Sequence, residues 1–299
     1  MEALQTNAPP SRPTLSSHLF KEFSDFIYTI SGIRFQESKS YFLASKIQNR
    51  CDASGQPNFD AYLAFLKSPA AKTTEYGLLL DQITINETFF FRNQPQLESF
   101  ERDFLQAMMV KRRAQGKRKI RIWSCASSTG DEAYTTALQI LAMEGAKDFR
   151  FEIIGTDICN DAVQKAKKGE YKRYAIRNIP PDMLQRYFDV AADQQTYILK
   201  DAVKNMVQFQ TSSLLDETRV RMLGKFDFAF CRNVLIYFDD ASKEKALTNI
   251  SNALEDDGVL IAGHSENLYS YRHLFRINKD HNQTHAYEKA PAGTEKSRF

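Results

Sequence analysis

Apolar residues in the first third of the chain recur at the spacing of an amphipathic helix. From Leu19 to Ile30 they form one stripe, and Gly32 follows as a helix end. The same spacing predicts helices over roughly 38–51, 59–66 and 73–85. Residues 18–85 are therefore expected to form an all-α N-terminal domain.

From residue 119 onward the pattern changes to short apolar runs separated by helical segments. The runs IRIWSCA, FEIIGTDI, FDFAFCRN and VLIAGHS predict a parallel sheet with crossover helices, an α/β domain over residues 119–289. Between the second and third runs, QQTYILKDAVKNMVQFQT holds two β-rich runs without a helix, so a small antiparallel β-subdomain is expected at about 190–212. Residues 86–118 remain as an inter-domain segment and linker helix.

Length and composition agree with two ordinary globular domains. At about 100–200 residues per domain, 299 residues suggest two units. The net charge of +3 is too small to indicate a nucleic-acid binder, and no apolar run approaches the length of about 20 residues that a membrane span needs. We expect residues 1–17 to form a disordered leader, residues 290–299 a flexible tail, and the protein to be a monomer without membrane insertion.

The cysteines Cys51, Cys125, Cys159 and Cys231 lie far apart in the sequence. No C-x-x-C pair occurs, so neither a metal site nor a disulfide framework is suggested, and a cytoplasmic location fits best. Packing of a small buried side chain is the expected role of the last three, with redox sensing as the alternative.

Polar residues follow the first two predicted strands, at the edge where an open parallel sheet binds its ligands. SSTGDEAY places Gly130 at a helix N-terminus with Asp131 and Glu132 in its first turn, and GTDI places Asp157 at a strand tip. Asp157 either accepts the ribose hydroxyls of a nucleoside or caps the next helix. The two acids at 131 and 132 either bind a ligand or only offset the helix dipole.

The turn after the first strand lacks both phosphate-binding patterns, G-x-G-x-x-G and G-x-x-x-x-G-K-[ST]. S-Adenosylmethionine has no phosphate, but it has a ribose, an adenine and an ammonium group that Glu132 can pair with. The sequence therefore favours S-adenosylmethionine over NAD or ATP as the cofactor, and no metal is expected.

Five segments, TINETFFFRN, WSCASSTGDEAYT, GTDI, FCRNVLIYFD and LIAGHSENL, resemble the signature segments of the chemotaxis receptor methyltransferases, the CheR family, in order and spacing. The resemblance covers about Leu19 to Tyr287. It implies a Rossmann-like S-adenosylmethionine-dependent methyltransferase domain with a small antiparallel β-subdomain, preceded by an all-α domain. It also implies methylation of glutamate carboxylates on chemoreceptor cytoplasmic helices, which forms glutamate methyl esters and S-adenosylhomocysteine in chemotaxis adaptation.

The resemblance further implies a set of site residues. Arg92 and Tyr237 are the candidates for positioning the substrate carboxylate, and Phe89–Phe91 are expected to brace the segment that carries Arg92. Ser213 stands where the family commonly has an asparagine. The implied cofactor-pocket residues are Asn86, Thr88, Arg92, Glu132, Asp157, Ser213, Leu214, Arg232 and Asn233.

Two contacts with the receptor are considered. Lys39, Lys46 and Arg50 lie seven and four positions apart, close to one face of a helix, which either docks an acidic methylation helix or is an ordinary solvated face. Many family members bind a receptor C-terminal peptide through a glycine-containing loop of the β-subdomain. The corresponding DVAADQQTYIL has no glycine, so weak or no binding of such a peptide is expected.

Two other functions stay open. A nucleic-acid methyltransferase on the same fold would need a basic stripe, for which Lys111–Arg121 is the available cluster. A non-catalytic adaptor would bind S-adenosylmethionine without transferring its methyl group. We expect no nucleic-acid partner.

Overall fold

The computed structural model describes residues 13–278 and 284–291, so most of the expected leader and tail lies outside the described residues. The chain divides into two units, Met1–Thr84 and Ile85–Phe299, each described here by itself. None of the helices in the described ranges is long and apolar enough to cross a membrane.

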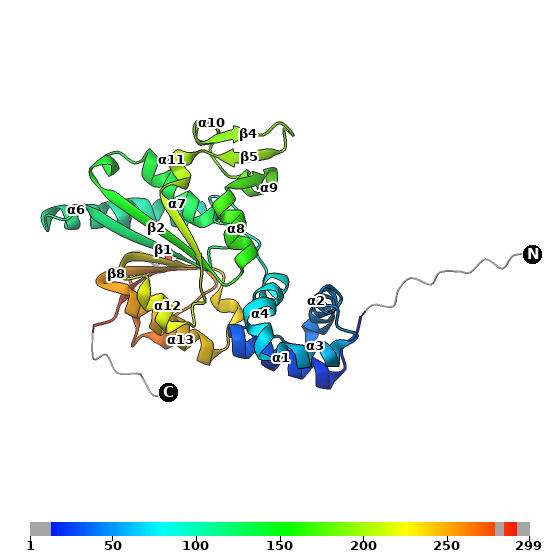
Figure 1. Cartoon of the computed structure of the whole chain (residues 1–299). Helices are drawn as coiled ribbons and strands as arrows, with labels where there is room; N and C mark the ends of the chain where they lie inside the picture. Colours follow the sequence, from blue (N-terminus) through cyan, green and yellow to red (C-terminus); the bar gives the residue numbers. More distant parts are fainter. Residues whose placement is uncertain (1–12, 279–283, 292–299) are drawn as a thin grey trace, which may run out of the picture. The chain divides into compact units, whose positions relative to one another are not determined.

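The first unit is all-α, as expected. Its first helix begins where the Ser16 hydroxyl accepts a hydrogen bond from the Leu19 N–H at 3.2 Å, and it ends at Gly32, whose φ is 74°. Phe23 and Ile27 of this helix are fully buried. The helices, visible in Figure 1, are α1 (Ser17–Ser31), η1 (Glu37–Lys39), α2 (Ser40–Ala53), α3 (Phe59–Leu66) and α4 (Pro69–Ile83).

A linker helix leads into the sheet of the second unit. It consists of α5 (Gln94–Ser99), the π-helical turn η2 (Phe100–Leu105) and α6 (Gln106–Ala114). Arg112 of α6 is buried and donates hydrogen bonds to Asp227 at 2.7 Å and to Asp257 at 2.8 Å. These ion pairs hold α6 to the strands that carry the two aspartates.

The main sheet has seven strands, and most neighbours are parallel. The two strands nearest the C-terminus are antiparallel to their neighbours. The α/β class is confirmed. In spatial order the strands are β6 (Val207–Thr211), β2 (Arg150–Asp157), β1 (Lys119–Cys125), β7 (Phe226–Cys231), β8 (Leu254–Ala262), β10 (Ala286–Lys289) and β9 (Phe275–Ile277).

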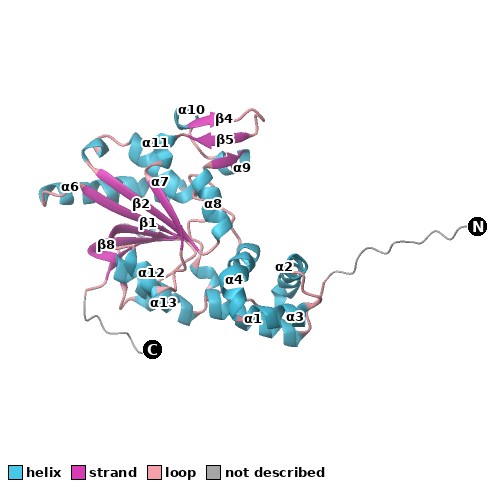
Figure 2. Ribbon diagram, viewed as in Figure 1, coloured by secondary structure: helices cyan, strands magenta, loops and turns pink. Residues whose placement is uncertain are grey.

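Helices cover both faces of this sheet (Figure 2). Adjacent residues of β1 point to opposite faces: Ile122 packs into one buried apolar cluster with Leu138 of α7, and Trp123 packs into another with Leu247 of α13. The helices are α7 (Asp131–Ala142), η3 (Ala146–Asp148), α8 (Asn160–Lys168), α9 (Arg173–Ile176), α10 (Pro181–Tyr187), α11 (Asp201–Lys204), α12 (Glu217–Met222), η4 (Leu235–Tyr237), α13 (Asp240–Ala253) and η5 (Tyr269–Tyr271).

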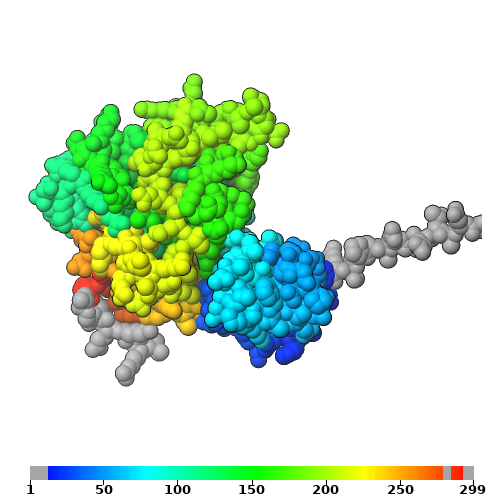
Figure 3. All heavy atoms as spheres, viewed as in Figure 1, coloured from blue at the N-terminus to red at the C-terminus, as the bar shows by residue number. Residues whose placement is uncertain are grey.

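A small antiparallel sheet is present, but its bounds differ from the expected range of about 190–212. Its strands, in the order β3-β5-β4, are β3 (Glu170–Lys172), β5 (Thr196–Leu199) and β4 (Phe188–Val190). The run at 207–211 pairs in parallel with β2 and is the edge strand β6 of the main sheet. β3 and β4 have three residues each, too few for a two-residue periodicity to show in sequence. The atoms of α10, β4 and β5 project at one end of this unit (Figure 3).

Candidate functional site

The carboxyl ends of β1, β2 and β7 meet at one edge of the sheet, and β1 lies between the other two. The chain leaves β1 in a sharp turn, because Ala126, Ser128 and Gly130 all have positive φ angles of 55°, 49° and 87°. A Cβ on Gly130 would lie 2.8 Å from the Phe209 ring. Glycine therefore permits the close approach of this turn to β6, at the N-terminus of α7.

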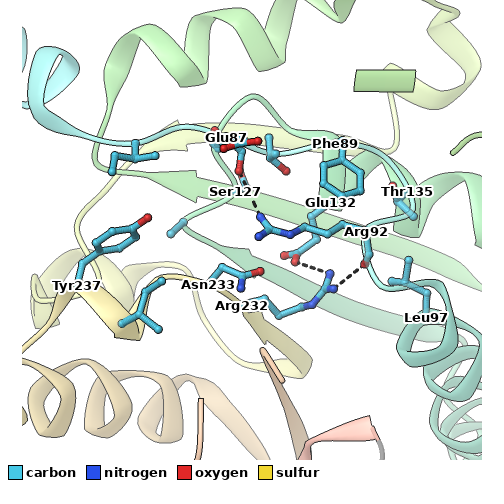
Figure 4. A pocket seen from close by; sticks show the side chains of 15 residues that line it. Glu87, Phe89, Arg92, Leu97, Ser127, Glu132, Thr135, Arg232, Asn233 and Tyr237 are labelled. Carbon is cyan, nitrogen blue, oxygen red and sulfur yellow. Dashed lines mark hydrogen bonds and ion pairs between the residues drawn. The ribbon is translucent and has the colours of Figure 1, made fainter. Parts of the chain in front are cut away.

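A cavity of about 150 Å³ opens at this edge of the sheet (Figure 4). Two arginines and two glutamates, Arg92, Arg232, Glu87 and Glu132, are part of its wall. Such paired opposite charges suit a zwitterionic group. The other residues of the wall are Ile85, Thr88, Phe89, Leu97, Ala126, Ser127, Ser128, Thr135, Asn233, Ile236 and Tyr237.

An ion pair between Arg232, the residue after β7, and Glu132 of α7 lies in the wall of the cavity. Arg232 Nη1 donates to Glu132 Oε2 at 3.0 Å, and the Ser124 hydroxyl donates to Glu132 Oε1 at 2.8 Å. Arg232 Nη2 donates to the Arg92 carbonyl at 2.6 Å, which ties the inter-domain segment to β7. The network fixes the backbone of Arg92 over the end of the sheet.

Two buried polar atoms of this wall have no hydrogen-bond partner within the described residues: Arg232 Nε and Ser127 Oγ. An unused buried donor is costly unless a ligand satisfies it. Arg232 Nε can donate a hydrogen bond to a ligand carboxylate, and the Glu132 carboxylate can accept hydrogen bonds from a ligand ammonium group. The residues present therefore fit the amino-acid end of S-adenosylmethionine.

The segment that carries Arg92 is held by its aromatic residues. Phe90 is fully buried, and Phe91 is 7% exposed in the same apolar cluster as α7. The Phe90 ring packs edge-on against Tyr171, with centroids 4.8 Å apart. Phe90 and Phe91 thus pack against the core as the expected bracing role requires, whereas Phe89 is half-buried in the cavity wall. The side chain of Arg92 reaches into the cavity and its Nη1 donates to the Glu87 carbonyl at 3.2 Å (Figure 4).

Asp157 ends β2 and is 5% exposed. Its carboxylate accepts hydrogen bonds from the Ser128 N–H at 2.7 Å and the Cys159 N–H at 2.9 Å. Ser128 lies in the cavity wall, so Asp157 supports this wall through the backbone of Ser128 without itself being part of it. The N-cap of α8 is Cys159 and not Asp157, because the Cys159 side chain accepts a hydrogen bond from the Ala162 N–H.

A buried glutamate that sequence reasoning did not single out shapes the opposite wall. Glu266 is 4% exposed and accepts hydrogen bonds from the N–H groups of Asn233, Val234, Leu235 and Gly263, all at 2.8–2.9 Å. It holds Asn233 at a positive φ of 60°. The motif LIAGHSENL contained this residue, but only the fold brings it to the turn after β7.

Six of the predicted catalytic and cofactor residues lie in the cavity wall, and four others, Asn86, Asp157, Ser213 and Leu214, do not. Asn86 is next to the cavity, where its carbonyl accepts a hydrogen bond from Ser128 and its amide donates to Cys159. The Ser213 hydroxyl accepts from the Leu215 N–H, and Leu214 is buried in the apolar cluster with Trp123. The residues in the wall are Thr88, Arg92, Glu132, Arg232, Asn233 and Tyr237.

The predicted docking face of α2 is only partly available. Arg50 donates to both carboxylate oxygens of Glu75, at 2.8 and 2.9 Å, and its side chain is 14% exposed. Arg50 is therefore engaged with Glu75, a partner 25 positions away that sequence spacing does not show, and its part in a docking surface stays a prediction. Lys39 is exposed and Lys46 is half-buried, with its ammonium 5.5 Å from the Phe42 ring centroid.

The cysteines and histidines among the described residues form no metal site. No group of three or more histidine, cysteine, aspartate or glutamate side chains in the described part of the chain is arranged to hold a metal ion. Cys125 and Cys231 are paired in register on β1 and β7 and are fully buried, and burial raises the pKa of both thiols well above the usual range. Thiols of this kind are unreactive, which fits a packing role.

Comparison with known proteins matches both units. The family described as "CheR methyltransferase, SAM binding domain" matches residues 86–283, and "CheR methyltransferase, all-alpha domain" matches residues 18–84. Chemotaxis protein methyltransferase 2 of Vibrio cholerae is 33% identical over 90% of this chain and 92% of its own length. The chemotaxis protein methyltransferase of Escherichia coli is 32% identical over 89% and 90%, and that of Borreliella burgdorferi is 30% identical over 83% and 87%.

Proposed function

Because the chain belongs to the CheR methyltransferase family, we propose that it methylates glutamate side chains on chemoreceptor cytoplasmic helices, with S-adenosylmethionine as the methyl donor. The products are glutamate methyl esters and S-adenosylhomocysteine. The observation that supports the proposal is the buried Arg232–Glu132 pair in the wall of the cavity beside Arg92, in which Arg232 Nε is a buried donor without a partner among the described residues.

The donor site follows from the charges of the cavity. Glu132 receives the ammonium group, Arg232 the carboxylate, and Asp157 the ribose, with Asn86, Thr88 and Asn233 along the same wall. Ser213 and Leu214 follow β6 and complete the proposed set on the adenine side. When bound, the donor supplies a sulfonium methyl group that a carboxylate oxygen attacks in line.

The residues of the chain need no general base for this reaction. A free glutamate has a pKa of about 4.3, so the substrate is an anion at neutral pH. The tasks left to the protein are alignment and exclusion of water. Arg92 and Tyr237 both line the cavity (Figure 4), which supports the proposal that these two side chains hold the two carboxylate oxygens.

The contacts of the basic run support a protein substrate over a nucleic acid. Within Lys111–Arg121, five basic side chains are paired with carboxylates of the same unit, so the run offers little free positive charge. The pairs are Lys111 and Arg112 with Asp257, Arg113 with Asp148, and Lys119 and Arg121 with Glu152.

Docking of the receptor is proposed to use Lys39 and Lys46 on the helical unit. The turn between β4 and β5 supports the absence of tail-peptide binding. Asp193 closes this turn by accepting hydrogen bonds from the N–H groups of Gln195 and Thr196, at 2.9 and 2.8 Å. This turn has no glycine and uses these two N–H groups internally, so it does not offer them to a peptide.

Incubation of the protein with tritiated methyl donor, a receptor cytoplasmic fragment and RNA tests the function. We expect label in the receptor that alkali releases as methanol, because esters are base-labile. A fragment with its methylated glutamates changed to alanine is the matched control and should take up none. Label in RNA would support the nucleic-acid enzyme, and binding without transfer would support the adaptor.

A further inference from the structure

The Phe89 ring is in contact distance of two arginines, the proposed catalytic one and a second from the small β-subdomain. The guanidinium carbon of Arg92 lies 5.6 Å from the ring centroid of Phe89, and that of Arg177 lies 3.6 Å from it. Arg177 is also 3.8 Å from the ring centroid of Tyr174. Its guanidinium therefore contacts two aromatic rings at once, an arrangement that suits planar arginine.

Two hydrogen bonds reinforce this stack. The Tyr174 hydroxyl donates to Glu87 Oε1 at 2.9 Å, and the Phe90 N–H donates to the Ala175 carbonyl at 3.0 Å. Glu87 in turn presents the carbonyl that accepts from Arg92 Nη1. Helix α9 and the residue after it thus contact the segment 87–90 at three residues, Glu87, Phe89 and Phe90. Two of these, Glu87 and Phe89, in turn contact Arg92.

The backbone around Arg92 needs such support. Phe91 and Asn93 flank it at positive φ angles of 53° and 64°, a conformation that costs free energy for residues with a side chain. The Phe91 N–H donates to the Thr135 hydroxyl at 3.1 Å, and the Arg92 carbonyl accepts from Arg232. These contacts fix the backbone, whereas the direction of the Arg92 side chain depends on Glu87 and Phe89.

We propose that Arg177, together with Tyr174, is a positioning residue that aims the Arg92 guanidinium at the substrate carboxylate. The proposal rests on the proposed function and assigns the β-subdomain a part in the methyl-transfer site. Neither residue lines the cavity, and both are exposed, so their effect passes through Glu87 and Phe89. Because a displacement of about 1 Å in a catalytic group can cost about 100-fold in rate, a loosened stack should lower kcat.

A different role for Arg177 makes a different prediction. If its charge attracted the acidic receptor directly, its loss would raise KM in a salt-dependent way and leave kcat unchanged. Arg186 of α10 supplies the matched control. It is an exposed arginine of the same subdomain, 5.3 Å from the Tyr187 ring centroid, and it does not line the cavity.

The test is steady-state methylation of a receptor fragment by full-length variants, with S-adenosylhomocysteine affinity from calorimetry. Arg177→Ala should lower kcat about tenfold, with KM for the receptor and the product affinity within about twofold of wild type. Tyr174→Phe removes only the hydroxyl and should lower kcat about two- to fivefold. Arg186→Ala should match wild type. The double variant tests whether the effect passes through Arg92. In a protein that already carries Arg92→Lys, Arg177→Ala should change kcat less than about twofold, because the guanidinium that Arg177 positions is absent.

An Arg177→Ala variant with the kcat of wild type overturns the proposal and leaves the proposed function standing. So does an equal loss in the Arg92→Lys background, or an equal loss from Arg186→Ala. A wild-type protein that forms no base-labile ester contradicts the proposed function itself and this inference with it.

Discussion

Each unit of the protein buries an arginine–glutamate pair, and the two pairs differ in how fully their polar atoms are used. In the helical unit, Glu75 accepts two hydrogen bonds from Arg50 and a third from the Tyr62 hydroxyl at 2.7 Å. Burial and the bond to Glu75 raise the pKa of Tyr62, which keeps it a donor. In the α/β unit, Arg232 bonds Glu132 through Nη1, while its buried Nε has no acceptor among the described residues.

This difference distinguishes a structural ion pair from one in a ligand site. We call Arg50–Glu75 the closed pair, because its polar atoms bond one another and it can contribute to folding without a ligand. We call Arg232–Glu132 the open pair, because it leaves a buried donor unsatisfied, and a bound ligand removes that cost in free energy. The predictions below test this distinction, beginning with the largest effect.

Removal of Glu75 should destabilise the helical unit strongly. Glu75→Ala leaves the Arg50 guanidinium, 14% exposed, without a counter-ion, and loss of one partner of a buried pair costs about 3–5 kcal/mol. Calorimetry of the full chain measures the unfolding. Asp25→Ala is the control, because the Arg34–Asp25 pair is 41% and 53% exposed and should contribute little. Equal losses from the two variants would contradict the structural role of the closed pair.

Asp131 is a buried carboxylate whose Oδ1 has no hydrogen-bond partner in the described residues. Burial raises its pKa to about 6 from 3.8, against the opposing hydrogen bond from Thr129 and the charge of Arg177. A raised pKa means that the stability present below pH 4 is lost as pH rises through 6. The shift corresponds to about 3 kcal/mol at neutral pH.

Asp131→Asn should therefore be more stable than wild type at pH 7.5, and the advantage should close below pH 4. Urea unfolding of both proteins across this pH range measures it. Parallel stability curves would show that ionisation of Asp131 costs the fold nothing.

The smallest expected effect is on the affinity for the receptor and concerns the lysines on and beside α2. Arg50 is paired with Glu75, whereas the contact described above for Lys46 is with the Phe42 ring. Lys39→Glu with Lys46→Glu should raise KM for receptor a few-fold, more at low salt, because charge attraction is screened over about 8 Å at physiological ionic strength. Methylation kinetics across a salt series decide this. A double variant with wild-type KM at low salt would make this an ordinary solvated face.

Sequence reasoning predicted the elements with clear periodicity and the residues at their ends. The apolar runs predicted β1, β2, β7 and β8. The family resemblance, rather than the periodicity, implied that Arg92, Glu132 and Arg232 belong to one site, and all three line the same cavity. It did not predict the three-residue strands β3 and β4, which are too short to carry a pattern.

Partners distant in sequence were the other gap. Arg50 and Glu75 are 25 positions apart, Arg232 and Glu132 are 100 apart, and nothing in local spacing pairs them. Glu266 was likewise missed as the acceptor of four N–H groups, because a carboxylate after a strand reads as a surface residue until the fold buries it. Tertiary contacts of this kind decide which charged residues are structural and which belong to the site.

Titration of S-adenosylhomocysteine into Glu132→Gln and Glu75→Gln, side by side with wild type, tests the central claim most directly. Loss of a charged partner of the ligand should weaken binding to Glu132→Gln about 10- to 100-fold, while Glu75→Gln should bind as wild type does at a temperature where it is folded. Equal, wild-type affinity in both variants would contradict the account and remove the Arg232–Glu132 pair from the cofactor site.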